Sequence, residues 1–256
     1  MGGNEKAEIQ IAQASKVDDT PEGFMDDVLR GRYAAGRERG GTGASATTEK
    51  IENLGVIKSI DLPGGLLKSN ESQPFLGTLT KFYAPRGTDT EFGFLQHTGR
   101  QVDQASADTF HKMLKDHPNL TAPLYIYNEA SGPPTQQQRD FMAKLSTVLG
   151  ATTLGDNQLT STGSRTPAFH LESARLETIN GKTVLAVDGW YRQKDDQGNW
   201  KTEPDGTPSK RRYSGIFIDG DGAGKAAQEL YLLSGQEAQF NKYNQQYKKS
   251  LQSIKW

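Results

Sequence analysis

The sequence predicts an α+β fold, in which an antiparallel β-sheet lies between helices as an α/β/α sandwich, preceded by a flexible N-terminal tail. Two β-rich runs flank Asn180-Gly181, a dipeptide that strongly indicates a two-residue hairpin turn. Two further runs, 211–218 and 228–233, are apolar on both faces, which is typical of central strands covered on both sides. A segment with one apolar stripe at helical spacing follows them.

Residues 1–50 are predicted to form the flexible tail. They are rich in Gly, Ala, Thr and charged residues, and cannot bury enough surface to offset the entropy of ordering. A short helix within 21–36 is the exception, with Thr20 as N-cap and Pro21 at the first helical position. This helix either docks loosely on the folded part or folds on contact with a partner. Residues 51–256 are predicted to form a single α+β domain, whose first strand begins near Leu54.

The first half of this domain is predicted to alternate between short strands and two helices. The expected strands lie at 56–62, 77–85, 91–97 and 122–127. The first helix is capped by Ser106 and ends before Pro118, which disfavours helical geometry at the preceding residue. The second helix begins with a capping box formed by Thr135 and Gln138, and it continues to about Leu149.

The Asn180-Gly181 hairpin has a register that the side-chain pattern supports. A two-residue loop pairs Ile179 with Lys182 and places apolar residues opposite one another on one face. The pairs expected on this face are Leu176 with Leu185 and Ala174 with Val187. The pairs expected on the other face are Glu177 with Val184, Arg175 with Ala186, Ser173 with Asp188, and Leu171 with Trp190. This second face is polar in the middle and becomes aromatic toward Phe169 and Trp190.

The last third of the chain is predicted to contain a protruding connection and a final helix. Segment 194–210 is polar and carries turn signals, so we expect it to extend from the sheet. The helix is predicted to start near Ser234, with Glu237 completing a capping box. Its apolar stripe, expected to pack on the sheet, consists of Phe240, Tyr243, Tyr247, Leu251 and Ile254. The opposite face carries Lys242, Gln245, Lys248, Lys249 and Gln252.

Composition excludes several classes of function. The 256-residue chain has a net charge of −1, so no global field favours nucleic acid or an acidic membrane. No run of about 18 apolar residues is present, which predicts no transmembrane segment. The absence of cysteine excludes disulfides, thiolate metal sites and a cysteine nucleophile. The compartment stays open between the cytoplasm and export with a signal peptide absent from this sequence, and the oligomeric state stays open too.

No motif for a cofactor or a metal passes a check of its spacing. Segment 219–225 resembles a calcium loop and a phosphate loop. It lacks the closing carboxylate of the first and the required glycine and hydroxyl of the second. A tight, mobile turn between two strands explains this segment better. The four histidines form no pair at metal-binding spacing. We therefore predict no cofactor and no metal site.

Two groups of residues are candidate functional sites. Arg175, Glu177 and Asp188 share one predicted face, where cross-strand ion pairing explains them and catalysis by the carboxylates is the alternative. The second group surrounds the protruding connection and contains aromatic and arginine residues, the types that dominate protein-binding hot spots. These candidate binding residues are Trp190, Tyr191, Trp200, Arg211 and Arg212. Acidic residues in the same connection weaken any nucleic-acid signal.

The order of the elements carries a family resemblance. A Leu62-Pro63-Gly64 turn follows an opening strand, and then come a hairpin, a helix, the antiparallel strands around Asn180-Gly181, and a closing helix with Phe240 and Leu251. Over about residues 54 to 256, this pattern resembles the PsbP/Mog1-like fold family. The resemblance implies a non-enzymatic assembly or binding protein, in bacteria often exported and lipid-anchored. The chain departs from the lipoprotein pattern because it has no cysteine to carry a lipid.

The sequence therefore predicts a non-enzymatic binding or assembly factor that acts through protein–protein contacts. One alternative is a hydrolase or transferase with a carboxylate site at Asp188 and Glu177. Another is an exported cell-envelope or effector protein. A deep pocket on the Asp188 face, with a carboxylate of raised pKa, would favour the enzyme.

Overall fold

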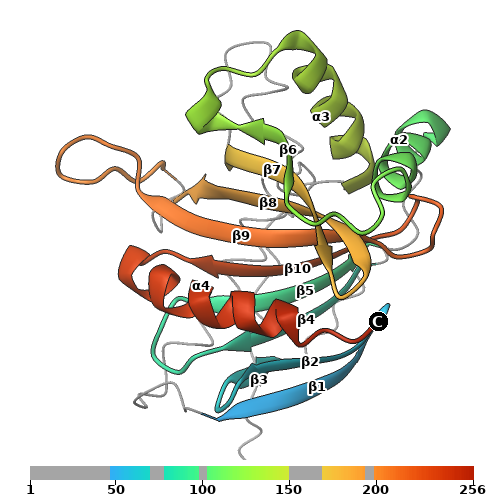
Figure 1. Cartoon of the computed structure of the whole chain (residues 1–256). Coiled ribbons are helices and arrows are strands. Elements are labelled where there is room, and N and C mark those ends of the chain that lie inside the picture. Colours follow the sequence, from blue (N-terminus) through green and yellow to red (C-terminus); the bar gives the residue numbers. More distant parts are fainter. Residues whose placement is uncertain (1–46, 70–77, 98–102, 150–168, 194–198) are drawn as a thin grey trace, which may run out of the picture.

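The computed structural model describes residues 47–69, 78–97, 103–149, 169–193 and 199–256 (Figure 1). Within this part of the chain, eight strands form one antiparallel sheet in the order β3-β4-β5-β10-β9-β8-β7-β6. They are β3 (Leu67–Ser69), β4 (Thr78–Ala84), β5 (Glu91–His97), β6 (Leu124–Asn128), β7 (Phe169–Ile179), β8 (Lys182–Arg192), β9 (Lys210–Asp219) and β10 (Ala227–Ser234). The predicted antiparallel sheet is confirmed. The predicted helix at 21–36 lies outside the described residues.

Strands β7 to β10 follow one another in sequence and in the sheet. The turn between β7 and β8 has positive φ at Asn180 and Gly181, 48° and 84°, as a type I′ turn requires. Strand β10 then pairs with β5, which joins two halves of the sheet that are distant in sequence. Strand β6 pairs with β7 at the far side. The predicted central position of β9 and β10 is confirmed.

Helices cover both faces of this sheet (Figure 1). Helix α4 (Glu237–Gln252) packs on one face together with a small sheet of β1 (Thr48–Leu54) and β2 (Ile57–Pro63), and we call this the α4 face. Helix α2 (Gln104–Lys115) packs on the opposite face, the α2 face, with α3 (Gln136–Leu149) beside it. The predicted α/β/α arrangement is therefore confirmed. None of the described helices is long and apolar enough to span a membrane.

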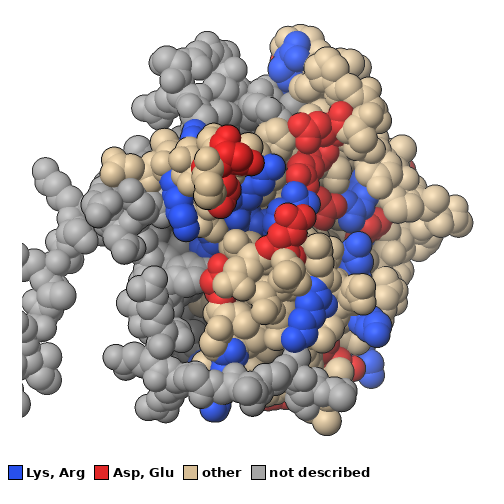
Figure 2. Space-filling model, turned by 90° about the vertical axis from the view of Figure 1, so that its left-hand side faces the viewer, with Lys and Arg blue, Asp and Glu red and all other residues tan. Residues whose placement is uncertain are grey.

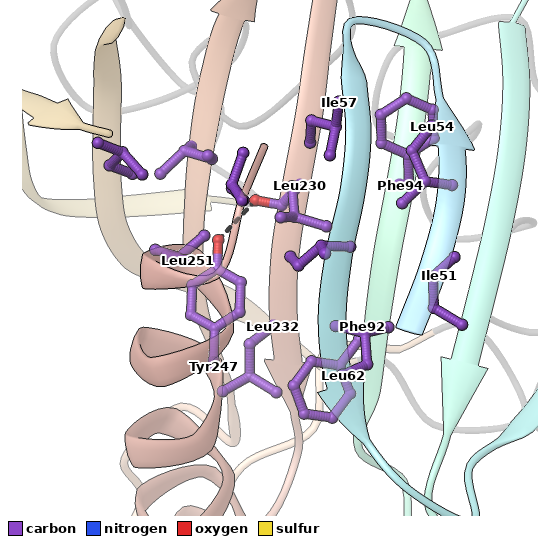
Figure 3. Packing of buried hydrophobic residues seen from close by; sticks show 14 of the residues in the cluster. Ile51, Leu54, Ile57, Leu62, Phe92, Phe94, Leu230, Leu232, Tyr247 and Leu251 are labelled. Carbon is purple, nitrogen blue, oxygen red and sulfur yellow. Dashed lines mark hydrogen bonds between the residues drawn. The ribbon is translucent and has the colours of Figure 1, made fainter. Parts of the chain in front are cut away.

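The core of the α4 face contains the apolar stripe predicted for the last helix. Figure 3 shows Tyr247 and Leu251 of α4 beside Leu232 of β10, with side chains of β1, β2 and β5 completing the cluster. The Tyr247 hydroxyl donates a hydrogen bond of 2.7 Å to the main-chain oxygen of Leu230. A fully buried side chain of this size contributes about 1.5–3 kcal/mol to folding. Helix α4 is thereby fixed against β10.

The residues after α4 attach it to both sheets. Asn180 donates through Nδ2 to the main-chain oxygens of Gln252 (2.9 Å) and Ile254 (2.7 Å). The Trp256 ring N–H donates to the main-chain oxygen of Ile179 at 2.7 Å. Lys255 forms an isolated bridge with Ser59 of β2. The Asn180-Gly181 turn thus also holds the end of the last helix.

Two glycines shape the core of the α2 face. A Cβ at Gly93 would lie 2.1 Å from the ring of Tyr231, and one at Gly215 would lie 2.1 Å from the Tyr213 hydroxyl. Both tyrosines are about 1% exposed and their rings stack at 5.7 Å. Only glycine leaves room for Tyr231 to lie over the neighbouring strand β5 and for Tyr213 to lie along its own strand β9.

Two predicted helix starts are wrong, because the cap of the first helix lies further upstream and the residue predicted to cap the last helix belongs to a strand. Helix α2 is capped by Asp103, whose side chain accepts from the Ser106 N–H, so Ser106 lies inside the first turn. Ser234 is the last residue of β10, and α4 begins after Gln236 without a side-chain cap. The Ser234 hydroxyl is fully buried and shares a hydrogen bond of 2.9 Å with Thr90 of the neighbouring loop.

Other element boundaries agree more closely with the sequence. The capping box at the start of α3 is confirmed, since Thr135 N–H donates to Gln138 Oε1 at 2.8 Å and Gln138 N–H donates to Thr135 Oγ1 at 3.2 Å. Strand β1 starts at Thr48, so the last three residues of the predicted tail belong to a strand. These three residues pair with β2, for example Glu49 with Leu62, and β2 lies within the predicted domain.

The connection between β8 and β9 protrudes from the sheet, as expected (Figure 1). We call its described residues, 199–209, the arm. Main-chain hydrogen bonds link Lys201 N–H to Gln193 oxygen (2.8 Å) and Ser209 N–H to Lys201 oxygen (3.0 Å), and Thr202 bridges Pro208. The arm is therefore a short hairpin built on the ends of the two strands.

Candidate functional site

A β-bulge in β7 shapes the polar part of the α4 face. The predicted register holds from Ile179 to Ser173, which pairs with Asp188, but Leu171 pairs with Gly189 in place of Trp190. The extra residue at the bulge is Glu172. Bulges change which way the following side chains point, and they are frequent beside functional sites. Phe169 consequently packs on the α2 face against Tyr191 and Tyr213, which corrects the predicted aromatic end of the polar face.

Asp188 lies at the centre of a hydrogen-bond network on the α4 face. The register aligns Ser173, Asp188 and Ser214 in one row across β7, β8 and β9. Asp188 Oδ2 accepts from the Ser173 hydroxyl at 3.1 Å, and Oδ1 accepts from the Ser214 hydroxyl at 2.7 Å. Arg175 donates from Nη1 to Asp188 Oδ2 and from Nε to Glu177 Oε2 at 3.2 Å. The predicted cluster is real, and two serines complete it.

Arg175 stays protonated in this network. Burial of the guanidinium acts to lower its pKa, but the nearby carboxylates of Asp188 and Glu177 act against this, and the pKa is raised above its ordinary value. A permanently charged arginine holds Asp188 as an ion-paired acceptor. The carboxylate is therefore bound on both oxygens, by Arg175 and by two serines.

A second ion pair lies beside the first. Arg212 donates from Nη1 to Glu172 Oε1 at 2.6 Å, which joins β9 to the bulge in β7. The Arg212 guanidinium carbon also lies 5.6 Å from the ring centre of Phe240 on α4. Both charged side chains are about a quarter exposed, at 26% and 27%. Arg212 is therefore held in one orientation while part of its guanidinium stays accessible.

Three side chains from these ion pairs, Glu172, Asp188 and Arg212, line a pocket of about 320 Å³. Its walls come from β6 on one side and from α4 on the other. The lining residues are Tyr125, Asn128, Glu172, Ser173, Asp188, Arg212, Tyr213, Phe240, Asn244 and Lys248. Figure 2 shows acidic and basic side chains intermixed across the middle of one face of the molecule. The pocket is thus polar and charged, with aromatic residues at its edges.

Two large apolar side chains are exposed on β6, beside the pocket. Tyr125, which lines the pocket, is 53% exposed, and Leu124 is 41% exposed. Strand β6 ends the described sheet. Its outward carbonyl at Ile126 accepts a hydrogen bond of 2.6 Å from Gln138 of α3. The strand edge is therefore partly covered, while the side chains remain accessible.

A row of stacked side chains continues the site beyond the pocket. His170 stacks on Trp190 with ring centres 4.7 Å apart, and the Lys210 ammonium lies 4.7 Å from the Trp190 ring centre. His170 also shares a hydrogen bond of 2.9 Å with Glu129, in the short 3-10 helix η1 (Glu129–Ser131). Trp190 pairs with Arg212 across β8 and β9, so this row adjoins the pocket.

The five predicted binding residues divide between two faces. Trp190 and Arg212 lie on the α4 face at the pocket and its neighbouring row. Tyr191 and Arg211 are only 6% exposed. Each is adjacent in its strand to Trp190 or Arg212, so its side chain points to the opposite face, the α2 face. Trp200 lies in the arm, with the Arg192 guanidinium 4.7 Å from its ring centre. The structure therefore brings two of the five together.

Tyr191 belongs to a buried aromatic group on the α2 face. Burial raises its pKa well above the ordinary value, with the Glu229 carboxylate adding to the effect. Burial and the same carboxylate raise the pKa of Tyr213 well above its ordinary value, and the Tyr213 hydroxyl donates to Glu229 Oε1 at 2.5 Å. These tyrosines therefore remain protonated and act as core residues.

Segment 219–225 forms a turn that its own aspartates close. Asp219 Oδ1 accepts from the Gly224 N–H at 3.0 Å, and Asp221 Oδ1 accepts from two further main-chain N–H groups. Asp219 Oδ2 lies 2.8 Å from Nδ1 of His111 on α2. The carboxylates thus hold the turn and attach it to α2. Within the described ranges, no cluster of three His, Cys, Asp or Glu residues could hold a metal ion.

Several pocket residues were missed from the sequence. The spacing of Phe240, Asn244 and Lys248 places them on one ridge of α4, and this signal was visible at steps of four residues. Lys248 had been assigned to the helix face opposite the apolar stripe. Glu172 had no local signal, because nothing in the sequence marks the bulge.

No protein-family model and no curated protein matches this chain.

Proposed function

We propose that the protein is a non-enzymatic binding or assembly factor, and that it holds a protein partner at the pocket between α4 and β6. The observation that carries this proposal is that the carboxylates of the pocket are already paired with arginines. Glu172 is hydrogen-bonded to Arg212, and Asp188 to Arg175. Such a prearranged polar surface favours recognition, because little side-chain entropy is lost when a partner binds.

The same geometry argues against the alternative of a hydrolase or transferase. A general base must reach the substrate proton with an oxygen that is not committed to structural contacts. Asp188 accepts hydrogen bonds on both oxygens, and Glu177 binds the same arginine from the other side. The pocket on the Asp188 face satisfies one condition for an enzyme, but its carboxylate is engaged in contacts with Arg175 and two serines.

The surroundings of the pocket have the composition of a binding surface. Tyrosine, tryptophan and arginine are enriched among residues that contribute most to protein interfaces, and Tyr125, Trp190 and Arg212 lie together here. A stable interface buries roughly 800 Å² on each partner. A pocket of about 320 Å³ would therefore hold the anchoring side chains of a larger contact. The PsbP/Mog1-like resemblance points to the same class of function.

The proposal is tested by affinity capture from the source cells with the full chain. We would compare the wild type with Arg212→Glu and Tyr125→Ala, and quantify captured proteins by mass spectrometry. Lys144→Glu, an exposed residue on α3, is the control for a charge change elsewhere. A partner that is retained by the control and lost by both pocket variants supports the proposal. A partner bound equally by all four proteins, or no specific partner, contradicts it.

A further inference from the structure

We infer that the pocket recognises an acidic side chain within an extended segment of the partner, and this inference rests on the proposed function. Two cations of the pocket carry it. Lys248 makes no ion pair or hydrogen bond within the described residues, although it lines the pocket. Its ammonium group has three donors to offer. Arg212 uses one guanidinium nitrogen for Glu172, which leaves other N–H groups of its planar fork for a carboxylate.

The two carboxylates that line the pocket, Glu172 and Asp188, are already bound by arginines and do not repel an incoming carboxylate strongly. Glu172 is bound by Arg212, and Asp188 is bound by Arg175, which also binds Glu177 outside the pocket lining. Of the charged groups that line the pocket, Lys248 is therefore the one without a partner of opposite charge in the described part of the chain. An incoming carboxylate would supply that charge.

A neighbouring amide indicates that the occupant also carries a donor. Asn244 lies one helical turn before Lys248 and lines the same pocket. Its side-chain oxygen is shielded from solvent, and no donor reaches it among the described residues. A shielded amide oxygen without a donor costs free energy, and rotation of the partly exposed Asn244 side chain toward an incoming N–H group would recover it. An extended peptide presents main-chain N–H groups beside each side chain, so one segment can satisfy Asn244 and Lys248 together.

The probe for this inference is a display library of random peptides, selected on the immobilised full chain. Enriched peptides would be synthesised with a fluorescent label, with both a free and an amidated C-terminus, and titrated by fluorescence anisotropy. The variants are Lys248→Gln, which removes the charge, and Lys248→Arg, which keeps it. Lys249→Gln is the matched control, because this neighbouring α4 lysine is exposed and outside the pocket lining.

The expected result is enrichment of Asp- or Glu-containing peptides. Their affinity should fall about 5-fold in Lys248→Gln, since a partly exposed charge contact contributes about 1 kcal/mol, and it should be retained in Lys248→Arg and Lys249→Gln. Binding should weaken as salt is raised. Peptides without acidic residues, equal loss in the Lys249→Gln control, or a requirement for a free C-terminus would overturn the inference. If cell capture still shows a partner that depends on Arg212, the proposed function stands while this inference fails.

Discussion

The substitution Arg175→Met tests the account of the polar network most severely. Methionine keeps much of the aliphatic stem but removes the guanidinium that binds Asp188 and Glu177. The side chains of Arg175 and Asp188 are 15% and 32% exposed, so the pair is neither fully buried nor on the open surface. Removing one partner of a buried pair costs about 3–5 kcal/mol, whereas an exposed pair contributes about 0.2–1 kcal/mol. We expect a loss of about 2 kcal/mol.

Urea unfolding of the full chain measures this loss as a change in midpoint at constant slope. Adding Asp188→Asn in the same protein should recover about 1 kcal/mol, because the unpaired carboxylate is then removed while the serine contacts are retained. Lys50→Met is the control, since it breaks an ion pair with Glu52 that is more than half exposed on both sides. The reasoning is refuted if Arg175→Met changes the unfolding free energy as little as the control, or if Asp188→Asn recovers nothing.

Three further predictions concern the rest of the fold. Tyr247→Phe removes one buried hydrogen bond to β10 and should lower the free energy of unfolding in urea by about 1–2 kcal/mol, whereas Tyr243→Phe, whose hydroxyl has no hydrogen bond to any described residue, should have a smaller effect. Trp256→Ala removes the indole hydrogen bond to β7 and should lower stability and increase hydrogen exchange at the end of α4, and unchanged exchange there would contradict the role given to it. Burial raises the pKa of Asp89, so the folded protein favours the protonated form, and this contribution is lost as pH rises through the folded pKa. Asp89→Asn should therefore be more stable than the wild type at neutral pH, with a difference that shrinks in acid; a difference that grows in acid would contradict this.

The parts of the fold that were predicted correctly depend on local chemistry. The Asn180-Gly181 turn requires positive φ at both residues, which few other dipeptides tolerate, and it fixed the register as far as Ser173. The Thr135 and Gln138 capping box is likewise a contact between residues three apart. Such signals are contained in a few adjacent residues, so the sequence alone reveals them.

The parts that were missed depend on contacts between distant residues. Ser234 is the last residue of β10 and its hydroxyl contacts Thr90, which is remote in sequence, so its place in the strand could not be recognised. The bulge at Glu172 changes the register by one residue and leaves no mark in the hydrophobic pattern. The pocket itself forms between α4 and residues of β6 to β9, and the contact of Phe240 with Arg212 joins residues that are distant in sequence.

Photo-crosslinking from Tyr125 tests the central claim most directly. This half-exposed residue lines the pocket and can be replaced by benzoylphenylalanine in the full chain, expressed in the source cells. The account predicts one dominant crosslinked protein that disappears when Arg212→Glu is added and is absent when the probe stands at Lys144 on α3. A crosslink that persists with Arg212→Glu, or that forms equally from Lys144, would contradict a partner site at the pocket.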